Sequence, residues 1–86
     1  MNIKAYPSFK KGYQRLPVQI KEKLAKQLEL LATNFRHPSL HTKRIQGTES
    51  IWEARVDYSY RLSFEIIEET IYLRVVGNHD DVLKKP

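Results

Sequence analysis

The 86-residue chain contains no cysteine, three glycines and no long run of apolar residues. Without cysteine there can be no disulfide, no thiolate zinc site and no cysteine nucleophile. No glycine-rich loop of the kind that cradles a nucleotide phosphate is present either. The first twenty residues hold four cations and no apolar stretch, which fits neither a signal peptide nor a membrane anchor. We therefore expect a cytoplasmic protein without membrane contact.

The residues that are present suit one small globular domain spanning residues 1–86. Hydrophobic residues make up 41% of the chain and include five Tyr, three Phe and one Trp, which makes disorder improbable. The net charge of +5 is uneven, because ten Lys and Arg oppose two acids up to residue 47 and five oppose eight thereafter. This asymmetry favours a polyanion or an acidic protein as partner. Lysines on exposed helix faces would give the same pattern.

The hydrophobic period predicts helices first and strands afterwards. Residues 3–6 alternate like a short strand, and Pro7-Ser8 begins a first helix with Phe9, Tyr13 and Leu16 at helical spacing. Pro17 opens a second helix that ends near Asn34. The apolar stripe of this second helix comprises Ile20, Leu24, Leu28 and Leu31 and should pack on a core. The two helices are expected to form an αα-hairpin.

After Pro38 the period changes to two, which is typical of strands. Four strands are expected at Thr42–Ile45, Trp52–Asp57, Tyr60–Ile66 and Ile71–Val76. The fold class is therefore α+β, with an N-terminal strand, an αα-hairpin and a four-stranded, mostly antiparallel sheet that carries the helices on one face. Alternation predicts that the helix-facing residues are Ala54, Val56, Leu62, Phe64, Ile71, Leu73 and Val75. The opposite face would carry Glu53, Arg55, Arg61, Ser63, Tyr72 and Arg74.

That opposite face is where chemistry is expected. Arg55 and Arg61 flank a hairpin and could converge on one phosphate, because a guanidinium offers a planar fork of donors and keeps its charge. The alternative is that each arginine pairs with a carboxylate such as Glu53 or Glu65. His79 could transfer a proton near neutral pH, or could be an ordinary residue of a polar turn.

Two further features could have a functional role but also have an ordinary structural explanation. Trp52 could stack on a base, although at the start of a strand it more often belongs to the core. His37 and His41 could suggest a metal, but Pro38 rules out a helical i, i+4 pair and no other ligand cluster is present. We expect no metal and no cofactor.

Several segments together resemble the RelE/ParE superfamily of bacterial toxin–antitoxin systems. They are His37-Pro38-Ser39-Leu40, Lys43-Arg44-Ile45-Gln46-Gly47, Trp52-Glu53-Ala54-Arg55, Tyr60-Arg61-Leu62-Ser63-Phe64 and Val75-Val76-Gly77-Asn78-His79-Asp80. The likeness covers nearly the whole chain in the order expected of that superfamily. It implies a toxin that is silenced by a cognate antitoxin and, in the RelE-like branch, an endoribonuclease that cleaves messenger RNA at the ribosomal A site.

By position, the resemblance implies roles for individual residues. Arg61 and Arg55 resemble the phosphate-binding cations, and His79 falls where some members place a catalytic histidine. Lys43 and Arg44 resemble the basic approach to the site, and Arg74 on the same face would add a phosphate contact. Glu53 stands where RelE has a lysine and could act as a carboxylate base.

The chain also departs from that pattern, since Val82-Leu83 occupies the place where many ribonuclease members have a tyrosine. A ParE-like gyrase inhibitor that acts by binding, or an inactive regulatory relative, are the alternative functions. One fold serves them all, so the fold cannot choose among them.

Overall fold

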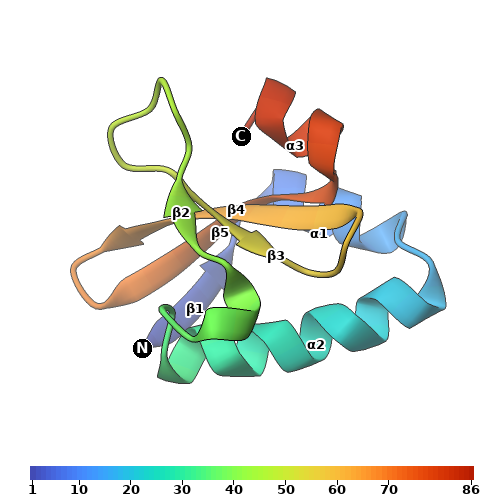
Figure 1. Cartoon of the computed structure of the whole chain (residues 1–86), viewed down its shortest axis with the longest axis horizontal. Coiled ribbons are helices and arrows are strands. Elements are labelled where there is room, and N and C mark those ends of the chain that lie inside the picture. Colours follow the sequence, from blue (N-terminus) through green and yellow to red (C-terminus); the bar gives the residue numbers. More distant parts are fainter.

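The computed structural model describes all residues from Met1 to Pro86 and places five strands in one sheet between helices (Figure 1). None of its helices is long and apolar enough to cross a membrane. In chain order the elements are β1 (Asn2–Ala5), α1 (Pro7–Gln14), α2 (Val18–Thr33), the 3₁₀ turn η1 (Pro38–Leu40), β2 (Lys43–Arg44), β3 (Trp52–Arg55), β4 (Tyr60–Ile67), β5 (Thr70–Asn78) and α3 (His79–Lys84).

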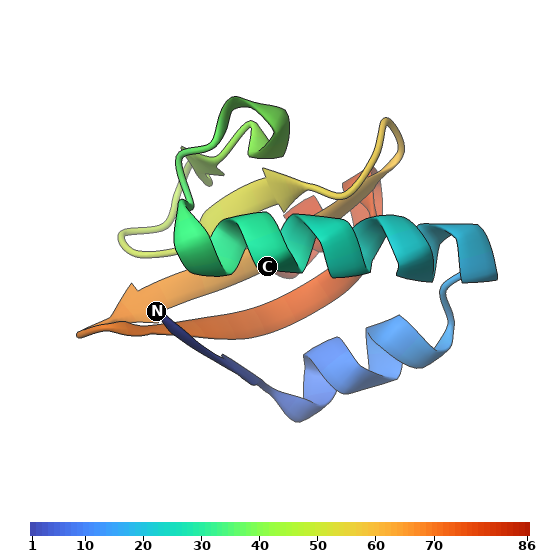
Figure 2. The same ribbon diagram turned by 90° about the horizontal axis from the view of Figure 1, so that it is seen from below.

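The two predicted helices are confirmed and lie on one face of the sheet (Figure 2). Pro7 opens α1 and Pro17 precedes α2, where a missing N–H costs no helical hydrogen bond. The stripe of α2 joins a core that includes Leu62, Phe64 and Leu73, as predicted, although Leu28 is only half-buried. Of the three residues at helical spacing, Phe9 and Leu16 are buried and Tyr13 is exposed, and Leu16 lies beyond Gln14, where α1 ends.

The sheet has five strands rather than four. Its order is β1-β5-β4-β3-β2, and the N-terminal strand joins it parallel to β5 while every other pair is antiparallel. The helical hairpin carries the chain across one face of the sheet from β1 at one edge to β2 at the other, and the antiparallel run β2-β3-β4-β5 then brings the last strand beside β1. β2 is the short strand at the opposite edge.

The predicted facing of β5 is wrong at Val75, because the strand contains a β-bulge. Ser63 pairs with Val75 but its neighbour Phe64 pairs with Leu73, so Arg74 is the extra residue. The alternation therefore shifts by one, and Val76 rather than Val75 is buried in the core. A single-residue insertion of this kind leaves no signature in a simple period-two pattern.

The opposite face of the sheet is partly covered, which was not predicted. Helix α3 packs on β4 and β5 on the side away from α2 (Figure 1) and buries Val82 completely. The Asn78 side chain accepts a hydrogen bond from the Asp80 N–H and so caps this helix. Ser63 is fully buried beneath it and donates to the main-chain oxygen of Pro86 over 3.0 Å.

Candidate functional site

A cleft of about 510 Å³ opens on this opposite face, beside α3. It has no hydrophobic lining residue, and five of the side chains predicted to carry chemistry line it together. The complete lining is His41, Thr42, Lys43, Glu53, Arg55, Arg61 and His79.

The pairing of the strands explains why these residues meet. Glu53 and Arg55 lie two residues apart on β3 and so project to the same face. In the ladders, Lys43 of β2 lies opposite Glu53, and Arg61 of β4 lies opposite Arg55. His79 begins α3 beside the β3–β4 turn, since its N–H donates to the Ser59 carbonyl over 2.9 Å. Residues from both halves of the chain therefore surround one space.

Arg61 is buried, with 9% of its surface exposed. Its Nη1 donates to the carbonyls of Asp57, Tyr58 and Tyr60 at 2.6, 3.0 and 3.0 Å, which fixes the turn between β3 and β4. These bonds use one nitrogen only, so the Nε and Nη2 donors remain for a ligand of the cleft. The predicted alternative, in which Arg61 pairs with a carboxylate, is not what the structure shows.

Glu53 and Arg55 each keep a polar atom without a partner. Glu53 is 4% exposed, and its Oε1 lies 3.6 Å from Lys43 Nζ, whereas its Oε2 is buried without a hydrogen bond. The Arg55 Nε is likewise buried and unpartnered. Leaving such groups unpaired costs roughly 1–3 kcal/mol each, more when they are charged. Buried polar atoms that the fold leaves free at a cleft are suited to bind a ligand.

The charges of the cleft favour an anion. Three cations, Lys43, Arg55 and Arg61, face a single carboxylate, Glu53. Arg55 and Arg61 are direct cross-strand neighbours, an arrangement that repels unless an anion lies between or near them. His79 also lines the cleft, and its Nδ1 lies 3.3 Å from Asp80 Oδ1.

Two smaller hollows share lining residues with the cleft and extend it. One shares Arg61 and His79 with it and continues past Tyr58 and Asp80, with a volume of about 360 Å³. The other shares Lys43 and Glu53, runs on to Leu83 and measures about 400 Å³. The site is therefore an elongated groove and not a closed pocket for a small molecule.

His41 is a cleft residue that the sequence did not reveal. It follows η1 in the left-handed region, with φ 47° and ψ 44°, which non-glycine residues rarely adopt. This backbone turns the chain into β2 and sets His41 and Thr42 at the cleft. No local pattern of residues predicts such a conformation at a histidine. No group of three or more His, Cys, Asp or Glu side chains is arranged to hold a metal ion.

The comparisons with known proteins concern the fold. No model of a protein family matches the chain, and no curated protein matches it either. Among solved structures, the RelB–RelE antitoxin–toxin complex from Methanococcus jannaschii matches 95% of this chain and 98% of its own, with a TM-score of 0.77 and 20% identity. The chain has the RelE fold. YafQ from E. coli is similar with a TM-score of 0.77 and 16% identity, and the match covers 94% of this chain and 96% of YafQ. A YoeB/ParE toxin from Agrobacterium tumefaciens is similar with a TM-score of 0.79 and 14% identity, and the match covers 92% of this chain and 99% of that toxin.

Within this RelE fold, two predicted residues do not line the central cleft: Arg74 lies outside it, and Arg44 lines only the extension that runs on to Leu83. Arg74 donates to Glu65 Oε1 over 2.7 Å and to the Pro86 oxygen over 2.9 Å, and lies over the Tyr6 ring. Glu65 also accepts a hydrogen bond from Tyr6, which is the largest of the causes that raise the pKa of the Tyr6 phenol. Arg44 lies over the Trp52 ring. Trp52 packs against the core rather than standing free.

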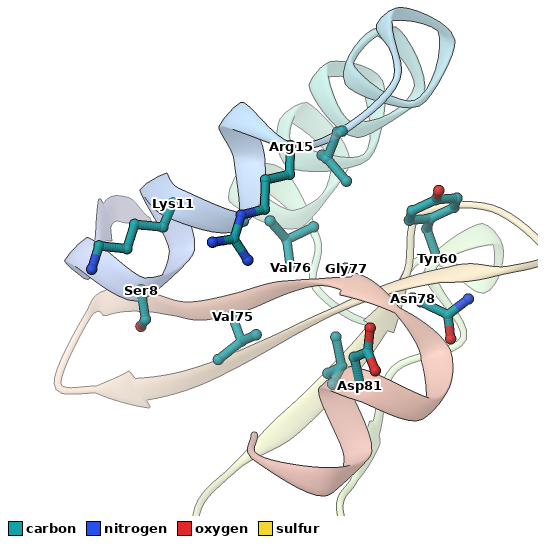
Figure 3. Close-up of a pocket in the computed structure, with 12 residues that line it drawn as sticks. Ser8, Lys11, Arg15, Tyr60, Val75, Val76, Gly77, Asn78 and Asp81 are labelled. Atoms are coloured by element: carbon teal, nitrogen blue, oxygen red, sulfur yellow. The ribbon is translucent and has the colours of Figure 1, made fainter.

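A separate groove of about 530 Å³ lies where β5 runs on beyond the end of β1 (Figure 3). Lys11 of α1 and Arg15, the residue that follows this helix, border one side and Asp81 of α3 the other, over a floor that includes Val76 (Figure 3). None of the predicted site residues lines this groove, so it is distinct from the cleft.

Proposed function

We propose that the chain is the toxin of a type II toxin–antitoxin system and that its cleft is a metal-free endoribonuclease site. The observation that carries this proposal is the meeting of Glu53, Arg55, Arg61 and His79 in one polar groove, with Glu53 Oε2 and Arg55 Nε left without partners. The shared RelE fold adds support, because the solved relatives include toxins bound to antitoxins.

The proposed reaction is attack of an RNA 2′-hydroxyl on the adjacent phosphate. Glu53 takes the proton of the 2′-hydroxyl, since its carboxylate lines the cleft and its Oε2 has no hydrogen-bond partner. Arg55 and Arg61 hold the phosphate and stabilise the charge that develops on its oxygens. His79 protonates the leaving 5′-oxygen, which leaves a 2′,3′-cyclic phosphate and a free 5′-hydroxyl. DNA has no 2′-hydroxyl and could not react in this way.

The elongated groove fits a polynucleotide. Its two extensions give room for the nucleotides on either side of the scissile phosphate, and its net positive charge suits a phosphate backbone. By extension from the RelE fold, we propose messenger RNA on the ribosome as the substrate and the cytoplasm as the place of action.

We further propose that a cognate antitoxin silences the toxin and that the groove of Figure 3 is one of the surfaces it covers. An antitoxin segment with one apolar and one acidic side would match the valines of the floor and the exposed cations Lys11 and Arg15.

The test is to map messenger 5′ ends in cells that produce the wild type, Glu53→Gln or His79→Asn. Glu53→Gln keeps the size of the side chain, His79→Asn keeps a polar but smaller one, and both remove proton transfer, so growth arrest and new 5′ ends should disappear together. His79→Asn should slow cleavage by roughly 10²–10⁴-fold. Growth arrest with intact messengers would refute the nuclease and favour the ParE-like alternative, for which DNA supercoiling is then assayed.

A further inference from the structure

Two arginine side chains share the ring of Trp52. The guanidinium carbon of Arg44 lies 5.2 Å from the ring centroid and that of Arg36 lies 5.7 Å from it. Arg36 also lies 5.1 Å from the centroid of Phe35, whose ring meets Trp52 edge-on at 79°. Such cation–π contacts hold flexible side chains in place and reduce the entropy that a ligand must remove.

This pair of cations has no acidic partner in the chain. The salt bridges of the structure involve neither Arg36 nor Arg44, and the Arg44 Nη1 donates only to the main-chain oxygen of Glu49 over 3.0 Å. Both arginines are exposed. Two positive charges are therefore held close together at the surface without neutralisation, an arrangement that attracts a ligand with several negative charges.

The pair lies just across the sheet edge from the cleft. Arg44 is directly opposite Trp52 in the β2–β3 ladder, and Trp52 stacks on the core residue Phe64 at 15°. Lys43, the preceding residue of β2, is opposite Glu53 and faces the cleft. The edge strand therefore presents Lys43 to the cleft, whereas Arg44 lies over Trp52 and lines the hollow that extends the cleft towards Leu83.

We propose that Arg36 and Arg44, held on Trp52, form a second phosphate-binding site for single-stranded RNA whose backbone passes from the cleft around the β2 edge. This inference rests on the proposed ribonuclease function. The planar fork of arginine is suited to phosphate. Phe64, Phe35 and the two guanidinium groups already occupy the surroundings of the indole, so the site contacts the RNA backbone and does not read a base.

The test measures binding of a fluorescent single-stranded RNA against salt concentration, in a Glu53→Gln background that does not cleave. Adding Arg36→Gln and Arg44→Gln should weaken binding. The negative slope of log affinity against log salt should decrease in magnitude by about 1.4, since each phosphate contact contributes about 0.7 to it. The matched control, Lys4→Gln with Lys10→Gln, removes the same charge from exposed residues of β1 and α1, far from the β2 edge, and should leave the slope unchanged.

The outcomes separate the two proposals. If the Glu53→Gln background binds no RNA, the ribonuclease proposal fails and this inference fails with it. If the background binds but the slope is the same with and without the arginine substitutions, the second site alone is refuted. The same holds if the substitutions weaken only the binding of an acidic antitoxin, because the surface then belongs to a protein partner.

Discussion

Replacing Arg61 with alanine should lower both the stability of the fold and the activity of the cleft. The buried guanidinium donates to three carbonyls of the β3–β4 turn. A hydrogen bond that involves a charged group contributes about 1.5–3 kcal/mol. Two effects offset part of the stability lost with these hydrogen bonds. Water can reach part of the turn, because Tyr58 is 87% exposed, and the substitution removes the charge repulsion between Arg61 and its cross-strand neighbour Arg55. We expect a net loss of about 2 kcal/mol, which in a domain of this size lowers the Tm by about 8–16 °C.

Urea unfolding of wild type, Arg61→Ala and the exposed-residue control Arg15→Ala measures this loss directly. The control should stay within about 0.5 kcal/mol of wild type. Cleavage is then compared at a temperature where every variant is folded, and Arg61→Ala should lose a factor of about 10²–10³ in kcat. An Arg61→Ala protein as stable as wild type would refute the role of Arg61 in fixing the turn. Full activity in the folded variant would refute its role in binding phosphate.

The remaining predictions concern packing, pH dependence and the partner. Gly12→Ala should destabilise the protein by about 1–3 kcal/mol in a thermal melt, because its Cβ would lie 2.3 Å from the Val76 oxygen; a gain of stability from helix propensity would contradict this contact. Burial alone would raise the pKa of Asp57, but hydrogen bonds from the Tyr60 and Ser59 N–H groups and the charge of Lys23 lower it overall. The stability advantage of wild type over Asp57→Asn should therefore be full above about pH 4 and should shrink as the pH falls through the folded-state pKa; an advantage independent of pH would contradict this. Reversing the charges of Lys11 and Arg15 to glutamate should reduce co-purification of the antitoxin from its operon, and undiminished recovery would remove the groove of Figure 3 from the proposed interface.

Local patterns were enough to predict most of the elements. The stripe on α2 and the strict alternation from Trp52 to Phe64 depend only on which residues follow one another, so they were visible in the sequence. Helix α3 was missed because its six residues, His79–Lys84, are too few to show a helical period and follow a turn-like Gly-Asn pair. The bulge at Arg74 was missed because it depends on which residue of β4 pairs with which of β5.

The candidate site was predicted in part. Alternation placed Glu53, Arg55 and Arg61 on one face, and the structure brings them together with His79 and Lys43. What the sequence could not show is the burial of Arg61 and the presence of His41, because both follow from backbone geometry at turns. Arg74 has the facing that the pattern predicts, but its side chain pairs with Glu65 instead of reaching the cleft.

The most direct test of the proposed function is the chemistry of the cut itself. Purified protein is incubated with a defined RNA in the presence of EDTA, alone and with translating ribosomes, and the product ends are identified by mass spectrometry. We expect products with a 2′,3′-cyclic or 3′-phosphate and a free 5′-hydroxyl, and no cut where the attacking 2′-hydroxyl is replaced by hydrogen. Cleavage that survives this 2′-deoxy substitution, or products with a 5′-phosphate, would contradict the mechanism proposed for the cleft.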